Sequence, residues 1–247
     1  MIRRQIPIQR IGIFLGGMRC GSTAMHDYLQ QHPEICVYKK KDPHFFSDDK
    51  EWEKGWESYL SGWDQYEPER HKVAFESSTH YTKAPMYPNT AARMASSPFD
   101  MRLVYGVRPP IERIESHFVH NAGKAYYDPD NKEERNRLLK QAINVSNYLM
   151  QLERFERFFS PHQLLIIETG DLIKKPSETL SRVCEFLVID ANHCFDAIPR
   201  RPRKFKQDTS TIKLTDEEIQ TASKALYEPT KAFEEKYGLQ LWDGVTS

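Results

Sequence analysis

The most constraining feature of the sequence is a glycine-containing loop that follows a short apolar run near the N-terminus. Residues 11–15 are rich in branched and aromatic side chains, which is typical of a buried strand. The loop Gly16–Gly21 comes next, and residues 22–31 have helical spacing that ends at His32-Pro33. A strand, a glycine loop and a helix N-terminus together form a phosphate site, because free N–H groups and the helix dipole both face the anion.

This loop resembles the Walker A sequence G-x-x-x-x-G-K-[ST], with one difference. The spacing from Gly16 to Gly21 matches, but Ser22 stands at the position of the lysine. A nucleoside triphosphatase needs that lysine on its β- and γ-phosphates. The cation here is Arg19, inside the loop, so we predict a nucleotide phosphate site without ordinary ATP hydrolysis. The alternative interpretation is an ordinary glycine turn between a strand and a helix.

Length and charge limit the class of protein. The chain has 247 residues, enough for one α/β domain with a sizeable core. Lys+Arg and Asp+Glu both number 35, and this balance argues against a protein that coats nucleic acid or anionic membrane. We find no run of membrane-spanning length, and residues 1–10 lack the apolar region of a signal peptide. We therefore expect a cytoplasmic protein with no nucleic-acid or membrane partner.

Four cysteines, at positions 20, 36, 184 and 194, are too few for a disulfide framework. We predict free thiols, with a Cys184–Cys194 disulfide as the less favoured alternative. Cys20 lies near a phosphate loop and a helix N-terminus, where a thiol pKa can fall. We interpret it as a residue that fills the loop, not as a nucleophile.

Strands and helices alternate along the rest of the chain. Apolar runs predict strands at 35–38, 73–75, 103–107 and 164–167. Helical spacing predicts helices at 48–62, 89–95, 111–121, 138–159, 176–187 and from 215 onward. In the first of these helices the aromatic residues share one face, which favours core packing over a substrate cage. The pattern predicts a single α/β domain over residues 1–247, with a central parallel sheet flanked by helices.

Two polar segments interrupt this pattern. Residues 123–137 are highly charged and contain a D-P-D-N turn, and we interpret the region 123–147 as a surface insertion or lid. A basic stretch, Arg200 to Lys206, either closes over a bound nucleotide or forms a solvated surface. His117 and His120 share one face of a predicted helix, but two histidines without further ligands do not make a metal site. We predict no metal.

In their order along the chain, these motifs resemble the PAPS-dependent sulfotransferase family, where PAPS is 3′-phosphoadenosine 5′-phosphosulfate. The family's 5′-phosphosulfate loop, G-x-x-[KR]-x-G-[TS]-[TS], is similar to residues 16–23. Its 3′-phosphate block, R-x-P-x-x-R-x-x-S-x-x-x-H, is similar to residues 108–120, and later segments in 168–187 and 226–242 are similar as well. The resemblance implies a P-loop-NTPase-like sulfotransferase fold and PAPS as the co-substrate.

The resemblance also implies which residues bind the cofactor. Arg19 and the neighbouring backbone N–H groups are expected to hold the 5′-phosphosulfate, and Arg108 and Ser116 the 3′-phosphate. The full expected set is Gly17, Arg19, Cys20, Gly21, Ser22, Thr23, Arg108, Ser116, Arg203 and Lys204.

The segment Lys41–Phe46, KDPHFF, is similar to the K-E-x-x-F-F motif of the branch that contains heparan sulfate sulfotransferases and many bacterial homologues. The glutamate of that motif is the usual general base, so the resemblance implies Asp42 as the base. The branch also carries E-K-S-P-x-Y, and residues 76–81 match it with Ser77 in place of the lysine. His44 and His80 are alternative bases, because histidine can accept a proton near neutral pH. The expected catalytic residues are thus Asp42, Arg19, His44 and His80.

The acceptor is less constrained. We predict sulfonate transfer to a hydroxyl, or to an amine or guanidinium nitrogen, of a small molecule. The acidic residues near the expected cleft suit a cationic natural product such as a saxitoxin-type alkaloid; they are Asp42, Asp48, Asp49 and Glu76. The alternatives are a polysaccharide O-sulfotransferase, a P-loop nucleotide phosphotransferase or kinase, and a non-catalytic nucleotide-binding module.

Overall fold

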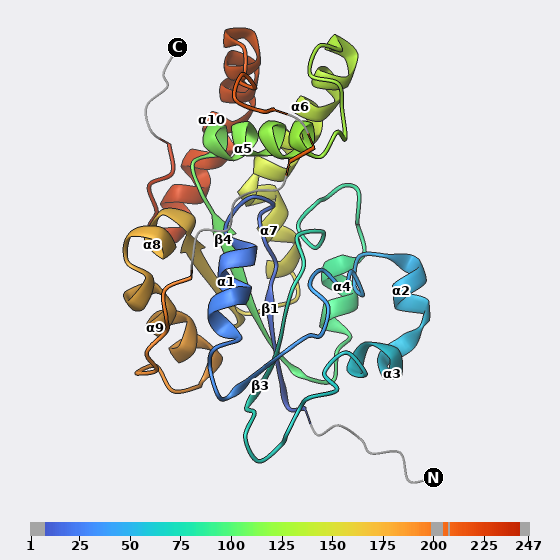
Figure 1. The fold of residues 1–247 in the computed structure, drawn as a ribbon, viewed down its shortest axis with the longest axis vertical. Coiled ribbons are helices and arrows are strands. Elements are labelled where there is room, and N and C mark those ends of the chain that lie inside the picture. Colours follow the sequence, from blue (N-terminus) through green and yellow to red (C-terminus); the bar gives the residue numbers. More distant parts are fainter. Residues whose placement is uncertain (1–7, 199–204, 207, 243–247) are drawn as a thin grey trace.

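A five-stranded parallel sheet forms the centre of the fold (Figure 1). A computed structural model describes residues 8–198, 205–206 and 208–242. The strands lie in the order β2-β3-β1-β4-β5. Their bounds are Arg10–Phe14 (β1), Ile35–Val37 (β2), Val73–Ser77 (β3), Asp100–Val107 (β4) and Leu164–Glu168 (β5). The predicted parallel α/β architecture is confirmed.

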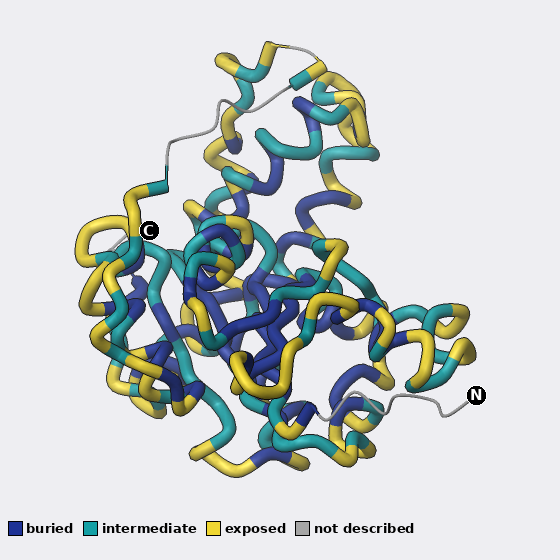
Figure 2. The backbone as a smooth tube through the Cα atoms, turned by 60° about the horizontal axis from the view of Figure 1, so that its bottom comes forward, coloured by how far each residue is buried: buried dark blue, intermediate teal, exposed yellow. Residues whose placement is uncertain are grey.

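Helices cover both faces of the sheet. They are α1 (Ser22–Leu29), α2 (Asp49–Glu53), α3 (Gly55–Leu60), α4 (Thr90–Ala95), α5 (Pro110–Gly123), α6 (Lys132–Ser146), α7 (Tyr148–Glu156), α8 (Thr169–Lys174), α9 (Pro176–Leu187) and α10 (Asp216–Tyr237). A 3₁₀ turn, η1 (Pro161–Gln163), precedes β5. Figure 2 shows the buried backbone concentrated in the centre of the molecule, with exposed segments around it.

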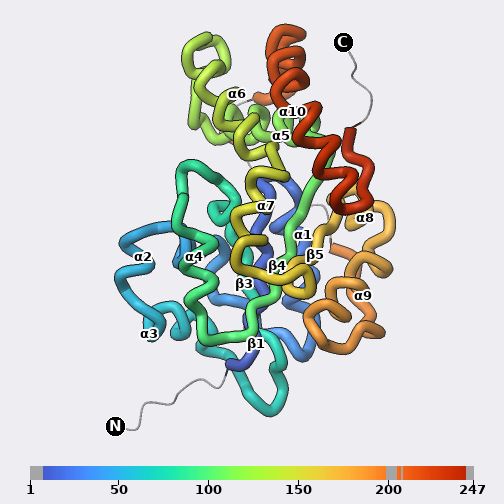
Figure 3. The backbone as a smooth tube through the Cα atoms, turned by 180° about the vertical axis from the view of Figure 1, so that it is seen from behind, coloured from blue at the N-terminus to red at the C-terminus, as the bar shows by residue number. Residues whose placement is uncertain are grey.

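Successive side chains of the strands point to opposite faces of the sheet and belong to two different apolar clusters. Phe14, Phe75 and Val104 point to the face covered by α1, α8 and α9. Ile13 and Leu103 point to the other face, where α3, α4, α7 and α10 contribute to the core. Figures 1 and 3, which view the molecule from opposite sides, place α1 and α7 on opposite faces of the sheet. Both faces are buried, as the continuous apolar strands predict.

A third apolar cluster lies beyond one end of the sheet, among α5, α6 and part of α10 (Figure 1). Arg135, near the start of α6, donates two hydrogen bonds to the Glu218 carboxylate of α10, at 2.9 and 2.6 Å. The region 123–147, which we interpreted as an insertion or lid, therefore contains a helix anchored on α10. Its role as a lid stays a prediction.

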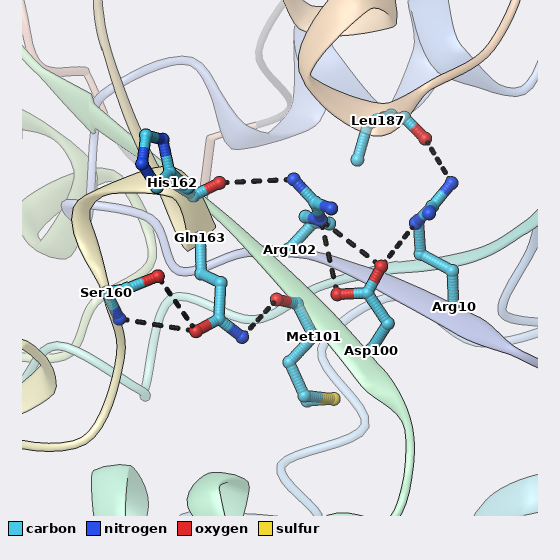
Figure 4. Close-up of polar contacts among 8 residues, drawn as sticks. All are labelled: Arg10, Asp100, Met101, Arg102, Ser160, His162, Gln163 and Leu187. Carbon is cyan, nitrogen blue, oxygen red and sulfur yellow. Dashed lines mark hydrogen bonds and ion pairs between the residues drawn. The ribbon is translucent and has the colours of Figure 1, made fainter.

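A polar network fixes the opposite edge of the sheet, where β1 and β4 begin (Figure 4). Arg10 Nε donates to Asp100 Oδ2 at 2.7 Å, and Arg10 Nη1 donates to the carbonyl of Leu187 at 3.1 Å. Arg102 also donates to Asp100 and reaches the carbonyl of His162. These bonds join two strands, α9 and η1 at the amino edge, so they stabilise strand positions rather than form part of a site at the carboxyl edge.

The structure differs from the predicted elements mainly in its helices. The helix expected at 48–62 divides into α2 and α3 at Gly55, which has φ +75°. The helix expected at 138–159 begins earlier, at Lys132, and breaks at Asn147, whose side chain caps α7 through the N–H of Met150. The short helix α8 was not predicted. The aromatic face of 48–62 packs in the core as expected, with Tyr59 buried and both Trp52 and Trp56 against it.

All four cysteines are free thiols. Cys184 lies on the buried face of α9 and Cys194 is exposed, and both are free thiols, so the less favoured disulfide between them does not form. No helix within the described part of the chain has the length and apolarity needed to cross a membrane.

Candidate active site

Most of the predicted site residues that the structure describes lie in segments that follow the carboxyl ends of four different strands. The glycine loop follows β1, Asp42 and His44 follow β2, His80 follows β3, and Arg108 follows β4. Because the strands are parallel, these residues meet at one edge of the sheet. This edge is where ligands bind in open α/β sheets.

The glycine loop adopts a conformation that suits close contact with an anion. Gly16 and Gly21 have φ values of +81° and +85°. Gly21 is the N-cap of α1, and no side chain caps the helix. The first-turn N–H groups of a helix have no intrahelical partner, so those of Ser22 and Thr23 are available for an anion. A Cβ at Gly17 would lie only 3.0 Å from Cys20 Sγ and from the carbonyl of Gly106.

Arg19 links this loop to α5. Its Nε donates to Ser116 Oγ at 3.1 Å, and its Nη1 donates to His120 Nδ1 at 3.4 Å. The residue expected at the 5′-phosphosulfate therefore contacts the residue expected at the 3′-phosphate. The two predicted halves of the cofactor site lie side by side, although 97 positions separate Arg19 from Ser116.

Arg108 satisfies only part of its hydrogen-bonding capacity. Its Nη2 forms an ion pair of 2.6 Å with Glu112. Its Nε is buried and has no hydrogen-bond partner among the described residues. A buried unpaired donor on a cation costs free energy unless a ligand satisfies it. The residues at this edge therefore fit an anionic group.

Arg113 is a fully buried cation with no carboxylate among the partners that the described chain provides. It donates to Ser146 Oγ at 2.5 Å, to the carbonyl of Ala142 at 2.8 Å and to the carbonyl of Met18 at 3.3 Å. It also donates to His117 Nδ1 at 3.3 Å, and burial followed by the Arg113 charge holds the pKa of His117 well below its usual range. Arg113 thus fixes the glycine loop against α5 and α6 and adds positive charge beneath it.

The Asp42 carboxylate is fixed by two donors. Its Oδ2 accepts from Lys41 Nζ at 2.9 Å, and its Oδ1 accepts from the Thr79 N–H at 3.0 Å. Burial alone raises the pKa of Asp42, but Lys41 and the Thr79 N–H outweigh it and hold this pKa below the usual value. The carboxylate is ionised at neutral pH. The Asp42 side chain is 30 % exposed to solvent. It can therefore be reached by a substrate.

The two candidate histidines form a stack beside Asp42. The rings of His44 and His80 lie 3.8 Å apart with an interplanar angle of 16°, and Tyr87 continues the stack. His44 Nδ1 lies 3.1 Å from Ser78 Oγ. Burial, together with nearby cations, lowers the pKa of His44 and lowers that of His80 to about 3. Both rings are neutral at neutral pH, and the structure brings all three expected bases together.

Three of the expected catalytic residues have left-handed backbone conformations. The φ values are +74° for Arg19, +56° for Asp42 and +59° for His44. Residues other than glycine rarely adopt such values, and strained positions cluster at functional sites. The same three residues were selected from sequence motifs, so backbone geometry and motif assignment agree.

Most of the acidic residues that favoured a cationic acceptor are engaged elsewhere. Glu76 is fully buried and accepts hydrogen bonds from Tyr59 Oη at 2.6 Å and Tyr81 Oη at 2.9 Å. Asp49 is ion-paired with Arg93, and Asp48 caps α2 through the N–H of Glu51. Of these four residues, Asp42 is the partly exposed carboxylate that is bonded to Thr79, the residue that lies against Gly16.

Other expected residues have different outcomes. Cys20 is buried, and burial raises its pKa, which agrees with a filling role and not with a nucleophile. No cluster of three or more potential metal-ligating side chains occurs among the described residues.

Arg200, Arg201, Arg203 and Lys204 lie outside the described residues. Their neighbour Phe205 packs against Gly123 at the end of α5, where Lys206 N donates to the Gly123 carbonyl at 2.7 Å.

Two residues near the carboxyl ends of the strands were not among the site residues predicted from the sequence. Arg113 lies within the matched 3′-phosphate block, but the motif alone assigns it no role. Lys83 is a half-buried lysine in the segment between β3 and α4. The sequence does contain a signal for it, because Ser77 replaces the lysine of the E-K-S-P-x-Y motif and a lysine follows at position 83.

Comparison with known proteins identifies the family. The family model described as "Sulfotransferase domain" matches residues 13–233. The chain belongs to the sulfotransferase family. The resemblance seen in the sequence is therefore confirmed, together with the expected sulfotransferase fold. The crystal structure of a sulfotransferase from Alicyclobacillus acidocaldarius has a TM-score of 0.73 at 21% identity, covering 93% of this chain and 96% of that one.

Sequence relatives of this sulfotransferase domain include enzymes with longer chains. Mouse heparan sulfate glucosamine 3-O-sulfotransferase 5 is 28% identical over 188 residues, which cover 71% of this chain and 52% of that protein. The chain thus spans about half the length of the heparan sulfate 3-O-sulfotransferase 5 sequences it matches. Mouse sulfotransferase SULT7A1, whose structure contains PAP, has a TM-score of 0.52 at 13% identity, covering 93% of this chain and 89% of that one.

Proposed function

We propose that this sulfotransferase domain transfers a sulfonate group from PAPS to a hydroxyl or amine of a small-molecule acceptor and releases adenosine 3′,5′-bisphosphate (PAP). The observation that carries the proposal is the contact between Arg19 and Ser116. It joins an anion-binding loop to a second anion-binding element, Arg108 and α5, as a nucleotide with two separate phosphates requires. The PAP in the structure of mouse SULT7A1 supports the same class of ligand.

The residues divide into two roles at the cofactor. Arg19 and the N–H groups at the start of α1 would bind the 5′-phosphosulfate and stabilise the negative charge that develops on the leaving phosphate oxygen. Arg108 Nε and Ser116 Oγ would bind the 3′-phosphate, which supplies the partner that the buried Nε lacks. Arg113 would position the loop from below.

Asp42 is the proposed general base. It is ionised, accessible and fixed by Lys41 and Thr79. It would accept the proton of the acceptor as the acceptor oxygen or nitrogen bonds to sulfur. His44 and His80 remain the rival bases, because both are neutral and lie in the adjoining stack.

The partners of the nearby carboxylates support one class of acceptor over another. A cationic acceptor of the saxitoxin type would depend on carboxylates, and three of the four expected ones are engaged elsewhere. A neutral hydroxyl-bearing or amine-bearing molecule fits the remaining groups better. The name of mouse heparan sulfate glucosamine 3-O-sulfotransferase 5 keeps a polysaccharide hydroxyl as the second candidate acceptor. Ser22 stands in place of the Walker lysine, and the loop's cation is Arg19, which argues against phosphoryl transfer.

The test has two parts. Calorimetry with PAP should show saturable binding, and binding should not require magnesium. PAPS labelled with ³⁵S should then transfer label to members of an acceptor collection that includes small alcohols, amines and heparan sulfate fragments. Absence of PAP binding by a folded protein would reject the proposal, and label transfer to heparan fragments alone would favour the second candidate.

A further inference from the structure

Tyr148, a residue that the mechanism above does not use, touches both halves of the proposed cofactor site. It is buried, with 1% of its surface exposed. Its hydroxyl donates to the backbone carbonyl of Arg108 at 2.9 Å. The same hydroxyl lies 3.8 Å from Cys20 Sγ in the glycine loop. One side chain therefore bridges the segment after β1 and the segment after β4 from below.

The ring of Tyr148 supports the glycine loop as well. A Cβ added at Gly17 would lie 3.5 Å from Cε1 of this ring, so the ring lies against the glycine backbone. The Gly17 N–H in turn donates to the carbonyl of Gly106 at 3.0 Å. The rings of Tyr105 and Phe233 pack against Tyr148, with centroids 5.9 and 5.8 Å away. Because neighbours hold the ring, the hydroxyl at its end has a defined position.

The break between α6 and α7 brings Tyr148 to this place. Asn147 leaves the helical conformation, with a backbone ψ of 77°, and its side chain caps α7. Directly before the break, Ser146 Oγ accepts from Arg113 Nε at 2.5 Å. Arg113 also donates to the carbonyl of Met18 in the glycine loop at 3.3 Å. The junction of the two helices thus contacts the glycine loop twice, once through Arg113 and once through Tyr148.

The backbone of Arg108 determines where its guanidinium points. Its Nη2 is paired with Glu112 at 2.6 Å, and its buried Nε has no hydrogen-bond partner among the described residues. Pro109 and Pro110 follow, and proline rings fix φ. A displacement of the Arg108 carbonyl would therefore pass to the start of α5 and to the guanidinium. The bond from Tyr148 opposes such a displacement.

We propose that Tyr148 is a positioning residue for recognition of the 3′-phosphate, because its hydroxyl holds the backbone of Arg108 against the glycine loop. This assignment rests on the proposed function. Tyr148 does not touch the nucleotide and acts through Arg108. The 3′-phosphate takes no part in the bonds that form and break, so its contacts are the same before and during transfer. Loss of the hydroxyl should therefore weaken binding and leave the chemical step unchanged.

The decisive experiment compares Tyr148→Phe with Tyr127→Phe by calorimetry with PAP and with 5′-AMP. Tyr127 is also buried, but among the described residues its hydroxyl has no hydrogen-bond partner, so the control removes a buried hydroxyl without removing a bond. We expect Tyr148→Phe to weaken PAP binding about threefold to tenfold, the range of one ordinary hydrogen bond. Its affinity for 5′-AMP should stay within about twofold of wild type, because that nucleotide lacks the 3′-phosphate. Tyr127→Phe should bind both nucleotides as wild type does.

Two further measurements separate positioning of Arg108 from a general effect on the fold. Adding Tyr148→Phe to Arg108→Ala should cause no further loss of PAP affinity, because the group through which the hydroxyl acts is already gone. In steady-state transfer of ³⁵S label, Tyr148→Phe should raise the KM for PAPS and leave kcat at saturating PAPS unchanged. Since phenylalanine keeps the ring in the core, the melting temperature should fall by no more than about 4 °C.

Three outcomes would overturn the assignment: wild-type PAP affinity in Tyr148→Phe, equal losses of affinity for PAP and 5′-AMP, or a further loss of PAP affinity on the Arg108→Ala background. Failure of the proposed function itself looks different, because wild-type protein would then neither bind PAP nor transfer label.

Discussion

Arg19 Nε lies 3.1 Å from Ser116 Oγ, and this hydrogen bond brings the loop after β1 into contact with the helix after β4. Two elements that are distant in sequence, and that we propose to bind the two ends of the nucleotide, thereby lie in contact. The first prediction concerns Arg19. Arg19→Ala should reduce kcat on the order of a hundredfold to a thousandfold, because it removes a donor to the leaving phosphate. Steady-state transfer of ³⁵S label is the measurement, with Arg157→Ala, at an exposed position after α7, as the control. An Arg19→Ala enzyme with wild-type turnover would remove Arg19 from the catalytic set.

The second prediction separates the two phosphates. Arg108 is assigned to the 3′-phosphate through its unpartnered Nε. Arg108→Ala should weaken PAP binding by about 1.5–3 kcal/mol, the range for a hydrogen bond to a charged group, and leave binding of 5′-AMP nearly unchanged. Calorimetry with the two nucleotides measures the difference. Glu112→Gln, which removes the ion-pair partner of Arg108, should leave PAP binding intact. Equal losses for both nucleotides would contradict the assignment.

The third prediction identifies the base. Asp42→Asn keeps an acceptor for the Thr79 N–H but cannot take a proton, so kcat should fall about 10²–10⁴-fold. PAP affinity should persist, since Asp42 lies on the acceptor side. Asp49→Asn is the matched control, because Asp49 is exposed and paired with Arg93. If Asp42→Asn is active and either His44→Gln or His80→Phe is not, the base is the corresponding histidine.

The fourth prediction concerns stability and pH. Burial raises the pKa of Glu76 to about 8, although the hydroxyls of Tyr59 and Tyr81 oppose the shift. An unfolded glutamate has a pKa of about 4.3, so the folded state binds this proton more tightly. The stabilising contribution is complete below about pH 4.3 and declines as the pH rises toward about 8. Its slope is about 1.4 kcal/mol per pH unit.

Glu76→Gln should remove this slope, because glutamine keeps the acceptor for both tyrosines and cannot ionise. Urea unfolding of wild type and variant at a series of pH values gives the difference in free energy of unfolding. That difference isolates Glu76 from the other titrating groups. Parallel curves for the two proteins between pH 5 and 8 would show that Glu76 is not the group responsible.

Local sequence patterns were sufficient to predict much of the fold. The strand, glycine loop and helix at residues 11–31 were predictable because apolar periodicity and glycine spacing act within a few residues. The same holds for the strand and the Pro-initiated helix around Arg108. The breaks at Gly55 and Asn147 were not predicted. Helical periodicity continues across both, and single turn or capping residues decide where one helix stops and the next begins.

The sequence by itself determined the fold class, the candidate phosphate loop and the set of candidate bases, because motif spacing and side-chain chemistry are properties of short segments. Only the tertiary structure decided that Arg19 meets Ser116, that Glu76 is buried between two tyrosines and that the Thr79 N–H holds Asp42. The physical reason is that a parallel sheet brings together loops from distant parts of the chain at one edge. Burial and pairing at that edge depend on neighbours that no single segment contains.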